Sequence, residues 1–588
     1  MDRAPDRLAN AMNQARFAVP FLALLALAPA QDAAFRFAPK DATLVMRMGA
    51  PARWKKDFAD TAMAKMMSAP ALAPMMDMMG KAMEEAMAGM RGSGFDADLV
   101  ERMLADYQGD FTLSIAVDWA KADLVTMGEE DPTLPFAITV AAAPHPSYDL
   151  AALAKALDGA VRKQLEEPGA PKTKEVPVGE LRLTAVADED GVWGTIPAIV
   201  DGHLVMFYGS DVEAQAAKAI EGKDRFEAAD AGKTPMFVHA DLRGFVTAMD
   251  QGVAEIEEMG GAPFDMGELL DAIGLRSLQD FRMTLGADGK HLVSDVQLGL
   301  RADKRGLMAM LPQSSAQPKL LRALPASASN WTITPLDLGA LYASAEQIVT
   351  MLETEMPMSW PDMMTAMAEE LKVRLKEDLL DHLGGELMML SDASELGDDA
   401  EAGDPLAAIN GQCMVLSLRD GAAFGKSVET MLRARGLHAA RKTEEYQGAK
   451  VHRMTLAGVL EMEYAITDDM LLLALGKSES ARASLRGVLD AKASGTATEL
   501  PAAVKAHLDA APAGWCGVGV TRPADTMMGV GQAMVGLVAM SGGGEAEQLG
   551  MIADVLQALA GEMKRLGVDT SAGFLYSGPK GVGYRLRW

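Results

Sequence analysis

Cysteine, histidine and aromatic residues are scarce in this sequence. Its 588 residues include 2 Cys, 8 His, 16 Phe, 8 Tyr and 7 Trp. Two Cys and eight scattered His cannot form a Cys₄ or Cys₂His₂ zinc site by local spacing. No two His stand four residues apart, the spacing that places two imidazole ligands on one helix face. The sequence therefore predicts no metal motif of these kinds.

Positive charge is also in short supply. There are 55 Lys and Arg against 82 Asp and Glu, a formal charge of −27. Such a field repels nucleic acid and anionic lipid, so we expect no nucleic-acid partner. The hydrophobic share of 49% is ordinary for a folded globular chain. A chain of this length can bury a large core.

The motifs of common enzymes are missing as well. A phosphate-cradling loop needs a Gly five residues before the Gly of its Gly-Lys-Ser/Thr triplet. The corresponding residues here are Glu227, Asp420 and Leu471. The three triplets are Gly232-Lys233-Thr234, Gly425-Lys426-Ser427 and Gly476-Lys477-Ser478. There is no Gly-x-Ser-x-Gly nucleophile elbow. The sequence therefore predicts a protein that is not an enzyme and has no cofactor.

The N-terminus is typical of a secretory signal peptide. Arg16 precedes the apolar run 17–27, and Ala28-Pro29-Ala30 offers small residues before a cleavage point. This predicts a signal peptide over 1–30 and a periplasmic or extracellular protein, with Met12 as an alternative start. The run is too short to cross a bilayer. The uncharged stretch 526–544 has a short, glycine-interrupted apolar part, so we expect no transmembrane segment in the mature chain.

Two cysteines remain after export, and both lie in strand-like runs. Cys413 is followed by Met-Val-Leu, and Cys516 lies between Trp515 and Gly517. In an oxidising compartment Cys413 and Cys516 can form a disulfide. The alternative is two separate, buried thiols. The sequence leaves both readings open.

Two segments of the chain resemble one another. Residues 198–209, AIVDGHLVMFYG, match residues 465–476, AITDDMLLLALG. Each reads as a strand end, a tight turn at Asp201-Gly202 or Asp468-Asp469, and an apolar strand that stops at Gly. Weaker matches follow in the same order along the chain, which indicates an internal duplication. The predicted domains are 35–311 and 319–588, joined by the proline-bracketed linker 312–318.

The predicted fold class is α+β. We expect two similar halves, each a mainly antiparallel β-sheet with helices packed on it, because hairpin signals outnumber strand–helix–strand alternation. Leu150, Leu153, Leu157 and Val161 recur at helical spacing and predict a helix over 150–165. The predicted strands are 43–48, 111–118, 136–142, 181–187, 192–200, 203–208, 235–240, 280–285, 291–300, 573–577 and 582–587.

Several of these features occur together. A strand opens near Pro39-Lys40-Asp41-Ala42, helices are rich in Met and Ala, and the hairpin at Asp201-Gly202 leads to a Gly209-Ser210 helix start. In this combination the chain resembles a group of exported bacterial proteins built on an uncharacterised domain. The resemblance covers most of the mature chain, and the second half departs from it at Asp469 and Lys477. It implies export, and it implies no activity.

Methionine is unusually frequent, with 43 residues. One group recurs at steps of three and four and therefore shares a helix face: Met76, Met79, Met83, Met87 and Met90. Methionine can fill a core that has few aromatics, or line an adaptable surface that binds an apolar ligand or a protein partner. Thioethers can also bind cuprous copper. A second group is Met356, Met358, Met363, Met364 and Met367.

Together these patterns predict an exported soluble protein with a non-enzymatic binding or structural role. The Met-rich helices are its expected contact with an apolar ligand or a protein partner. One alternative is a periplasmic copper-handling protein that uses Met thioethers. Another is a hydrolase whose site is assembled only in space.

Overall fold

The computed structural model describes most of the chain, with gaps. The described residues are 35–49, 51–73, 107, 109–122, 136–146, 148–165, 172–187, 192–222, 225–228, 234–258, 265–311, 316–352, 358–391, 412–456, 460–476, 478–495, 499–528, 544–568, 570–578 and 581–588. The predicted signal peptide and Met76, Met79, Met83, Met87 and Met90 lie outside the described residues.

The chain forms two compact units, and both contain segments that are distant in sequence. The first unit comprises the described residues up to Ala64 and those of 73–259 and 279–296. The second comprises 65–72 and the described residues of 260–278 and 297–588.

The predicted fold class, with two halves that each have their own sheet, is wrong. Within the part of the chain that the structure describes, 21 strands belong to one large antiparallel sheet, and these residues show no clear duplication into two halves. Alternation of apolar and polar residues indicates which face of a strand is buried, but it does not identify the neighbouring strand. The number of sheets was therefore beyond what the sequence pattern could establish.

The strands of the first unit pair in the order β4–β5–β6–β8–β3–β2–β1–β9–β10, and all these pairings are antiparallel. The short β7 also pairs with β8. The bounds are β1 Leu44–Met48, β2 Phe111–Val117, β3 Phe136–Ala142, β4 Thr173–Val178, β5 Leu181–Ala187, β6 Trp193–Thr195, β7 Ala198–Val200, β8 His203–Gly209, β9 Met236–Asp241, β10 Leu278–Asp288 and β11 His291–Leu300.

Helices cover both faces of the strands β3 and β8. Val140 and Leu204 share a buried cluster with α6, Leu150–Leu165. Their chain neighbours Ala141 and Val205 belong to the cluster of α7, Val212–Glu221. Successive side chains of a strand point to opposite faces. Because both faces are covered, β3 and β8 contain nearly continuous apolar runs.

The strands of the second unit pair in the order β15–β16–β17–β18–β14–β13–β12–β19–β20–β21, and all are antiparallel. The bounds are β12 Asn330–Pro335, β13 Leu383–Ser391, β14 Gln412–Leu418, β15 Lys442–Tyr446, β16 Ala449–Leu456, β17 Leu460–Ile466, β18 Met470–Leu475, β19 Trp515–Thr521, β20 Ser571–Gly578 and β21 Gly581–Arg587.

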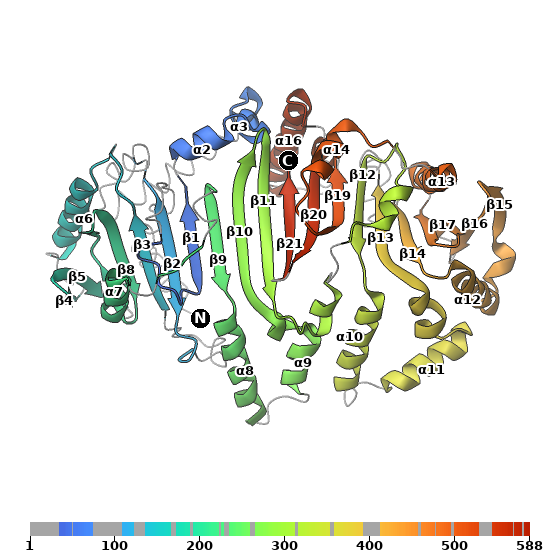
Figure 1. Ribbon diagram of the computed structural model, residues 1–588, viewed down its shortest axis with the longest axis horizontal. Coiled ribbons are helices and arrows are strands. Elements are labelled where there is room, and N and C mark those ends of the chain that lie inside the picture. The colour runs from blue at the N-terminus through green and yellow to red at the C-terminus, as the bar shows by residue number, and fades with distance from the viewer. Residues whose placement is uncertain are drawn as a thin grey trace. The chain divides into compact units, whose positions relative to one another are not determined.

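Two helices pack on opposite faces of β17 and β18. Helix α13, Glu479–Ser494, buries Leu485 in the large core that also holds Leu472. Helix α12, Gly421–Ala434, buries Phe424 against Leu471. Figure 1 shows both helices beside the strands β14 to β17. These two helices and the strands between them frame the site described below.

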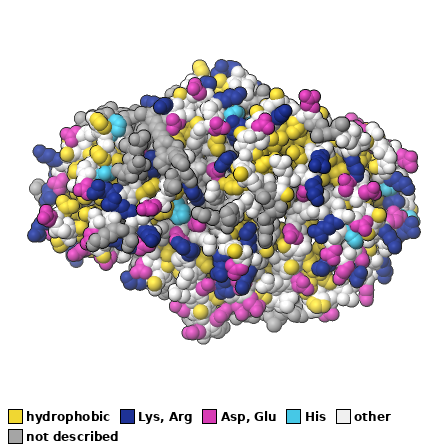
Figure 2. Space-filling model, in the orientation of Figure 1, with side chains coloured by type: hydrophobic (Ala, Val, Ile, Leu, Met, Phe, Trp, Pro, Cys, Tyr) yellow, Lys and Arg dark blue, Asp and Glu magenta, His cyan; other side chains and the backbone are white. Residues whose placement is uncertain are grey.

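The remaining helices differ in length and in burial. No helix among the described residues is long and apolar enough to cross a membrane. On the face shown in Figure 2, acidic and basic side chains are interspersed with apolar ones.

The bounds of the remaining helices are α2 Pro51–Phe58, α3 Ala62–Met67, α8 Arg243–Glu258, α9 Met266–Ile273, α10 Leu338–Met351, α11 Trp360–Leu371, α14 Ala502–Asp509 and α16 Gly544–Arg565.

Candidate ligand-binding site

A pocket of about 570 Å³ lies in the second unit, among α12, the strands β16 and β17 and the end of α13. Pockets for small molecules span about 300–1,000 Å³, so this one can enclose a ligand. Its lining residues are Gly421, Ala422, Gly425, Val428, Glu429, Arg441, Gln447, Gly448, Ala449, Lys450, His452, Tyr464, Ile466, Thr467, Asp468, Leu489, Lys492 and Ala493.

Two aromatic rings form part of the pocket lining. His452 of β16 stands directly opposite Tyr464 of β17 in the strand register. Their ring centroids are 4.9 Å apart and the rings are tilted by 39°. The Nδ1 atom of His452 lies 2.8 Å from Oγ1 of Thr443. Because cross-strand partners share a face, the hairpin register itself builds this aromatic surface.

His452 is neutral at pH 7. Burial lowers the pKa of its imidazole, and the positive charges of Arg441 and Lys450 lower it further, against the opposing effect of Glu429. A neutral imidazole can donate one hydrogen bond and accept another. The ring therefore offers a polar edge as well as a flat face.

Small residues on α12 leave space for the pocket. Gly421 cannot carry a side chain, because a Cβ there would collide with the carbonyl oxygen of Thr467. Its N–H donates to the Asp468 carbonyl at 3.0 Å, which holds the helix start against the β17–β18 turn. Ala422 and Gly425 also line the pocket, and Val428 adds an apolar surface one turn later. The helix start is capped by Asp420, which accepts from the Ala423 N–H at 2.9 Å.

Arg441 is a cation in the pocket lining whose position is fixed by two hydrogen bonds. Arg441 donates through Nη1 to Glu429 at 2.7 Å and to the Tyr464 hydroxyl at 3.1 Å. Glu429 also accepts from Arg433 at 3.0 Å. The hydrogen bond from Arg441 holds the pKa of Glu429 below its ordinary value, although burial opposes this. Burial raises the pKa of Tyr464, so its hydroxyl keeps its proton at neutral pH.

A second cation lies near the β17–β18 turn. Lys492 of α13 donates to Oγ1 of Thr467 at 2.8 Å and pairs with Asp469. Burial tends to raise the pKa of Asp469, but the hydrogen bond and the charge of Lys492 outweigh burial. The pKa is therefore below its ordinary value, and the carboxylate is ionised. Thr467 and Asp469 therefore both hold the ammonium group of Lys492 in place.

The lining has a small positive excess. Arg441, Lys450 and Lys492 stand against Glu429 and Asp468, with His452 neutral. The whole chain has a charge of −27, so this balance is unusual for the protein. Aromatic and aliphatic walls with an excess cation suit a ligand with an apolar body and one negative group.

Cys413 and Cys516, for which the sequence left a disulfide open, are free thiols in the structure. Cys413 is buried in β14, and burial raises the pKa of its thiol to about 12. Cys516 is buried in β19, where its S–H donates to the Leu575 carbonyl at 3.6 Å. Both are therefore protonated at neutral pH, and the structure contains no disulfide between them.

Of the second Met group, Met358 is exposed and Met363, Met364 and Met367 lie on α11.

Sequence reasoning missed this pocket. Gly425 was notable in the sequence only as part of a Gly-Lys-Ser triplet, and Asp468 only as part of a predicted turn. The available signal was weak: small residues at Gly421 and Gly425 on one helix face, followed by a hairpin with an aromatic residue and a His. Among the described residues, no group of three His, Cys, Asp or Glu is placed to hold a metal ion.

No family model and no curated protein matches the chain. Two solved structures show a likeness, crystal forms III and I of the protein TP0453. Form III is 7% identical and covers 48% of this chain and 83% of its own, with a TM-score of 0.21. Form I is 8% identical and covers 47% and 81%, again at 0.21. Scores this low show no shared fold, so no property is transferred.

Proposed function

We propose that the protein is an exported, non-enzymatic binding protein, and that the pocket of the second unit binds a small organic anion with an apolar body. The observation that carries this proposal is the pocket of about 570 Å³ with an aromatic surface and a held cation. The apolar ligand predicted from the methionines differs from this one in charge and in location, and it stays a separate prediction.

The bonding of the polar groups supports binding rather than catalysis. A general base needs a partner that orients it and a substrate proton within reach. His452 contacts the Thr443 hydroxyl instead of a carboxylate. Arg441 and Glu429 form an ion pair at 2.7 Å, and each has a second partner, Tyr464 and Arg433 respectively. Such groups position a bound molecule without exchanging protons with it.

The other sequence hypotheses stay predictions. Contact through Met76, Met79, Met83, Met87 and Met90, and copper binding by their thioethers, fall outside the described residues. The spatially assembled hydrolase and the resemblance to exported bacterial proteins likewise await a test. Release of residues 1–30 during export would be seen by sequencing the N-terminus of the secreted protein.

The dye anilinonaphthalene sulfonate, an aromatic anion, tests the pocket by fluorescence titration. Ala422 lines the pocket and is exposed, so Ala422→Trp fills space without disturbing the core. We expect binding to weaken by about tenfold or more, a change of about 1.4 kcal/mol. Lys492→Met removes a cation near the pocket rim, and we expect a loss of no more than about fivefold.

Thr430→Trp is the matched control for the bulky substitution. Thr430 is exposed on the same helix and does not line the pocket. We expect this variant to bind the dye as the wild type does, with unchanged circular dichroism in all variants. Equal dye affinity in wild type and Ala422→Trp would show that the pocket is not the binding site.

A further inference from the structure

A second, smaller pocket of about 170 Å³ lies in another part of the second unit. It is formed by the end of α9, the 3₁₀ turn at 275–277 and the loop 301–305 that follows β11. Six residues line it: Asp271, Arg276, Ser277, Arg301, Asp303 and Arg305. All six carry a polar or charged side chain. The pocket therefore differs in kind from the larger one.

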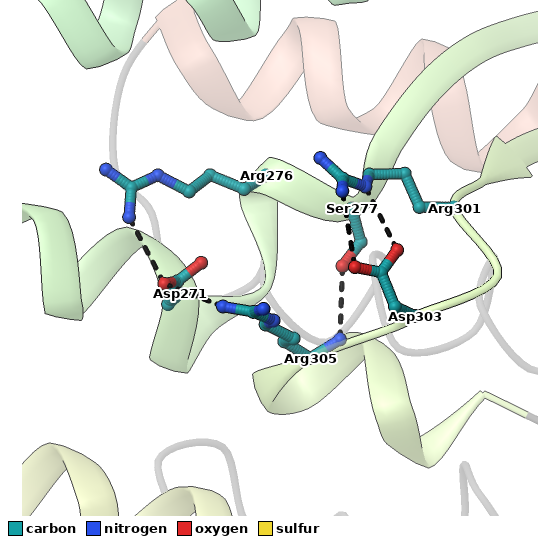
Figure 3. Close-up of a pocket in the computed structure, with 6 residues that line it drawn as sticks. All are labelled: Asp271, Arg276, Ser277, Arg301, Asp303 and Arg305. Atoms are coloured by element: carbon teal, nitrogen blue, oxygen red, sulfur yellow. Dashed lines mark hydrogen bonds and ion pairs between the residues drawn. The ribbon is translucent and has the colours of Figure 1, made fainter.

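Guanidinium groups outnumber carboxylates in this pocket. Asp271 is shared by two arginines, at 3.2 Å from Arg276 and 3.4 Å from Arg305. Figure 3 shows Asp271 between these two side chains, with the Arg301–Asp303 pair on the other side of Ser277. Arg301 donates through Nε and Nη2 to Asp303, at 3.0 and 3.2 Å. Three permanent positive charges thus face two negative ones.

The geometry of these ion pairs leaves N–H donors for a ligand. A guanidinium has five N–H donors. Among the described residues, the side-chain hydrogen bonds of Arg301 end on Asp303, and the guanidinium of Arg305 contacts Asp271 through Nη1 alone. The guanidinium of Arg305 in particular has more N–H donors than the described residues offer it acceptors. An added anion can therefore be bound without loss of the existing pairs.

Ser277 adds a buried hydroxyl. It is 2% exposed, and its Oγ accepts from the Arg305 N–H at 3.1 Å. Within the described residues no acceptor lies in hydrogen-bond reach of its own hydroxyl proton. A buried donor without an acceptor is costly. An oxygen atom of a ligand in the pocket would accept this proton.

We propose that this pocket is a binding site for a phosphate group. Arginine forks bind the oxygens of phosphate in pairs, and the Ser277 hydroxyl supplies one more donor. The volume of about 170 Å³ is enough for one phosphate group. The source is either free phosphate or the head group of a phosphate ester. The proposal is independent of the organic anion in the larger pocket.

Equilibrium dialysis with radiolabelled inorganic phosphate at low ionic strength tests the proposal on the full mature chain. We expect Arg305→Gln and Arg301→Gln each to weaken binding at least about tenfold, because each removes a charge-assisted donor group. Asp303→Asn removes a competing carboxylate, so it should tighten binding. A gain of affinity cannot arise from misfolding.

The matched controls come from the Arg243–Asp241 pair in the first unit. This pair has the same two-residue spacing and a comparable exposed guanidinium. Arg243→Gln and Asp241→Asn should leave phosphate binding unchanged, and so should Ala422→Trp. The proposal is overturned if the wild type binds neither inorganic phosphate nor phosphatidic acid vesicles, or if Arg301→Gln and Arg243→Gln behave alike.

Vesicles separate the two sources of the phosphate group. Phosphatidic acid presents a phosphate monoester at a lipid surface, and phosphatidylcholine vesicles serve as the control. Retention of inorganic phosphate with no selective binding to phosphatidic acid supports a soluble ligand. Selective vesicle binding that is lost in Arg305→Gln supports a lipid head group. Either result agrees with the phosphate site, and failure of both contradicts it.

Discussion

The hairpin that joins β7 to β8 and the one that joins β17 to β18 reverse the chain by different means. In the first, Val200 pairs with His203, so the loop has two residues, Asp201 and Gly202, with φ of 48° and 82°. In the second, β17 ends at Ile466 and β18 begins at Met470, so the three residues Thr467, Asp468 and Asp469 form a longer loop. The sequence patterns looked alike, but the turns are not.

The difference follows from the residue after the first Asp. Two-residue hairpin loops of the I′ type need positive φ at both positions, which Asp-Gly supplies. Asp468-Asp469 lacks the glycine, and the structure uses hydrogen bonds instead. The Thr467 N–H donates to the Met470 carbonyl at 2.8 Å, and the Met470 N–H donates to Thr467 Oγ1 at 3.1 Å. The wider loop also borders the larger pocket.

The largest expected effect concerns His203, which begins the strand after the two-residue turn. It is buried against the Phe37 ring, and its Nδ1 lies 3.1 Å from the Asp201 carbonyl. Burial, and then the charge of Arg36, lowers the pKa of His203 to about 4. Between about pH 6.5 and pH 4 the unfolded chain therefore binds a proton that the folded chain does not. Stability falls as the pH falls through this window.

We expect a loss approaching about 3 kcal/mol from this residue between pH 7 and pH 4, since one pKa unit corresponds to about 1.4 kcal/mol. Urea unfolding at several pH values measures it. His203→Gln should reduce the pH dependence by that amount. His438→Gln, at an exposed histidine, should keep the wild-type slope. Parallel slopes for wild type and His203→Gln would contradict the prediction.

The second prediction breaks the two-residue turn itself. Gly202→Ala places a Cβ at φ of 82°, a conformation that costs an L-residue about 1–2 kcal/mol. Space is not the problem, because the nearest atom to that Cβ would be 3.8 Å away, in Pro144. Thermal unfolding measures the loss. Gly159→Ala, at an open position in α6, serves as the control and should not destabilise.

The third and smallest effect belongs to the wider loop. The Lys492–Asp469 pair is partly exposed, with side chains 33% and 63% accessible. We expect Asp469→Ala to lower the free energy of unfolding by less than about 1 kcal/mol, and less still in high salt. Asp468→Ala is the control, because Asp468 makes no ion pair among the described residues. If Asp469→Ala destabilised the protein more than Gly202→Ala does, the expected order of the two turns would be wrong.

Local elements were predictable wherever the residue pattern was strong. The helix predicted over 150–165 is α6, with the same ends. The strand 136–142 is β3, and the hairpin strand 291–300 is β11. In each case apolar periodicity or an Asp-Gly turn acts within a few residues, so no distant contact was needed.

Two failures have identifiable causes. β4, Thr173–Val178, was missed because it contains charged residues and Pro177, which lacks an N–H. The strand predicted over 192–200 is two short strands, β6 and β7, separated by Ile196 and Pro197. Proline cannot donate to a strand ladder, which ends the pairing there.

The sequence by itself determined the alternation along each strand, the start and end of helices such as α6, and the positive φ of the Asp201-Gly202 turn. These depend on residues that are neighbours in the chain. Only the tertiary structure decided that the described strands join one sheet, and that Arg441, Glu429 and Tyr464 meet in one pocket. Pairing and pocket formation depend on which distant surfaces exclude water together, and no local pattern records that choice.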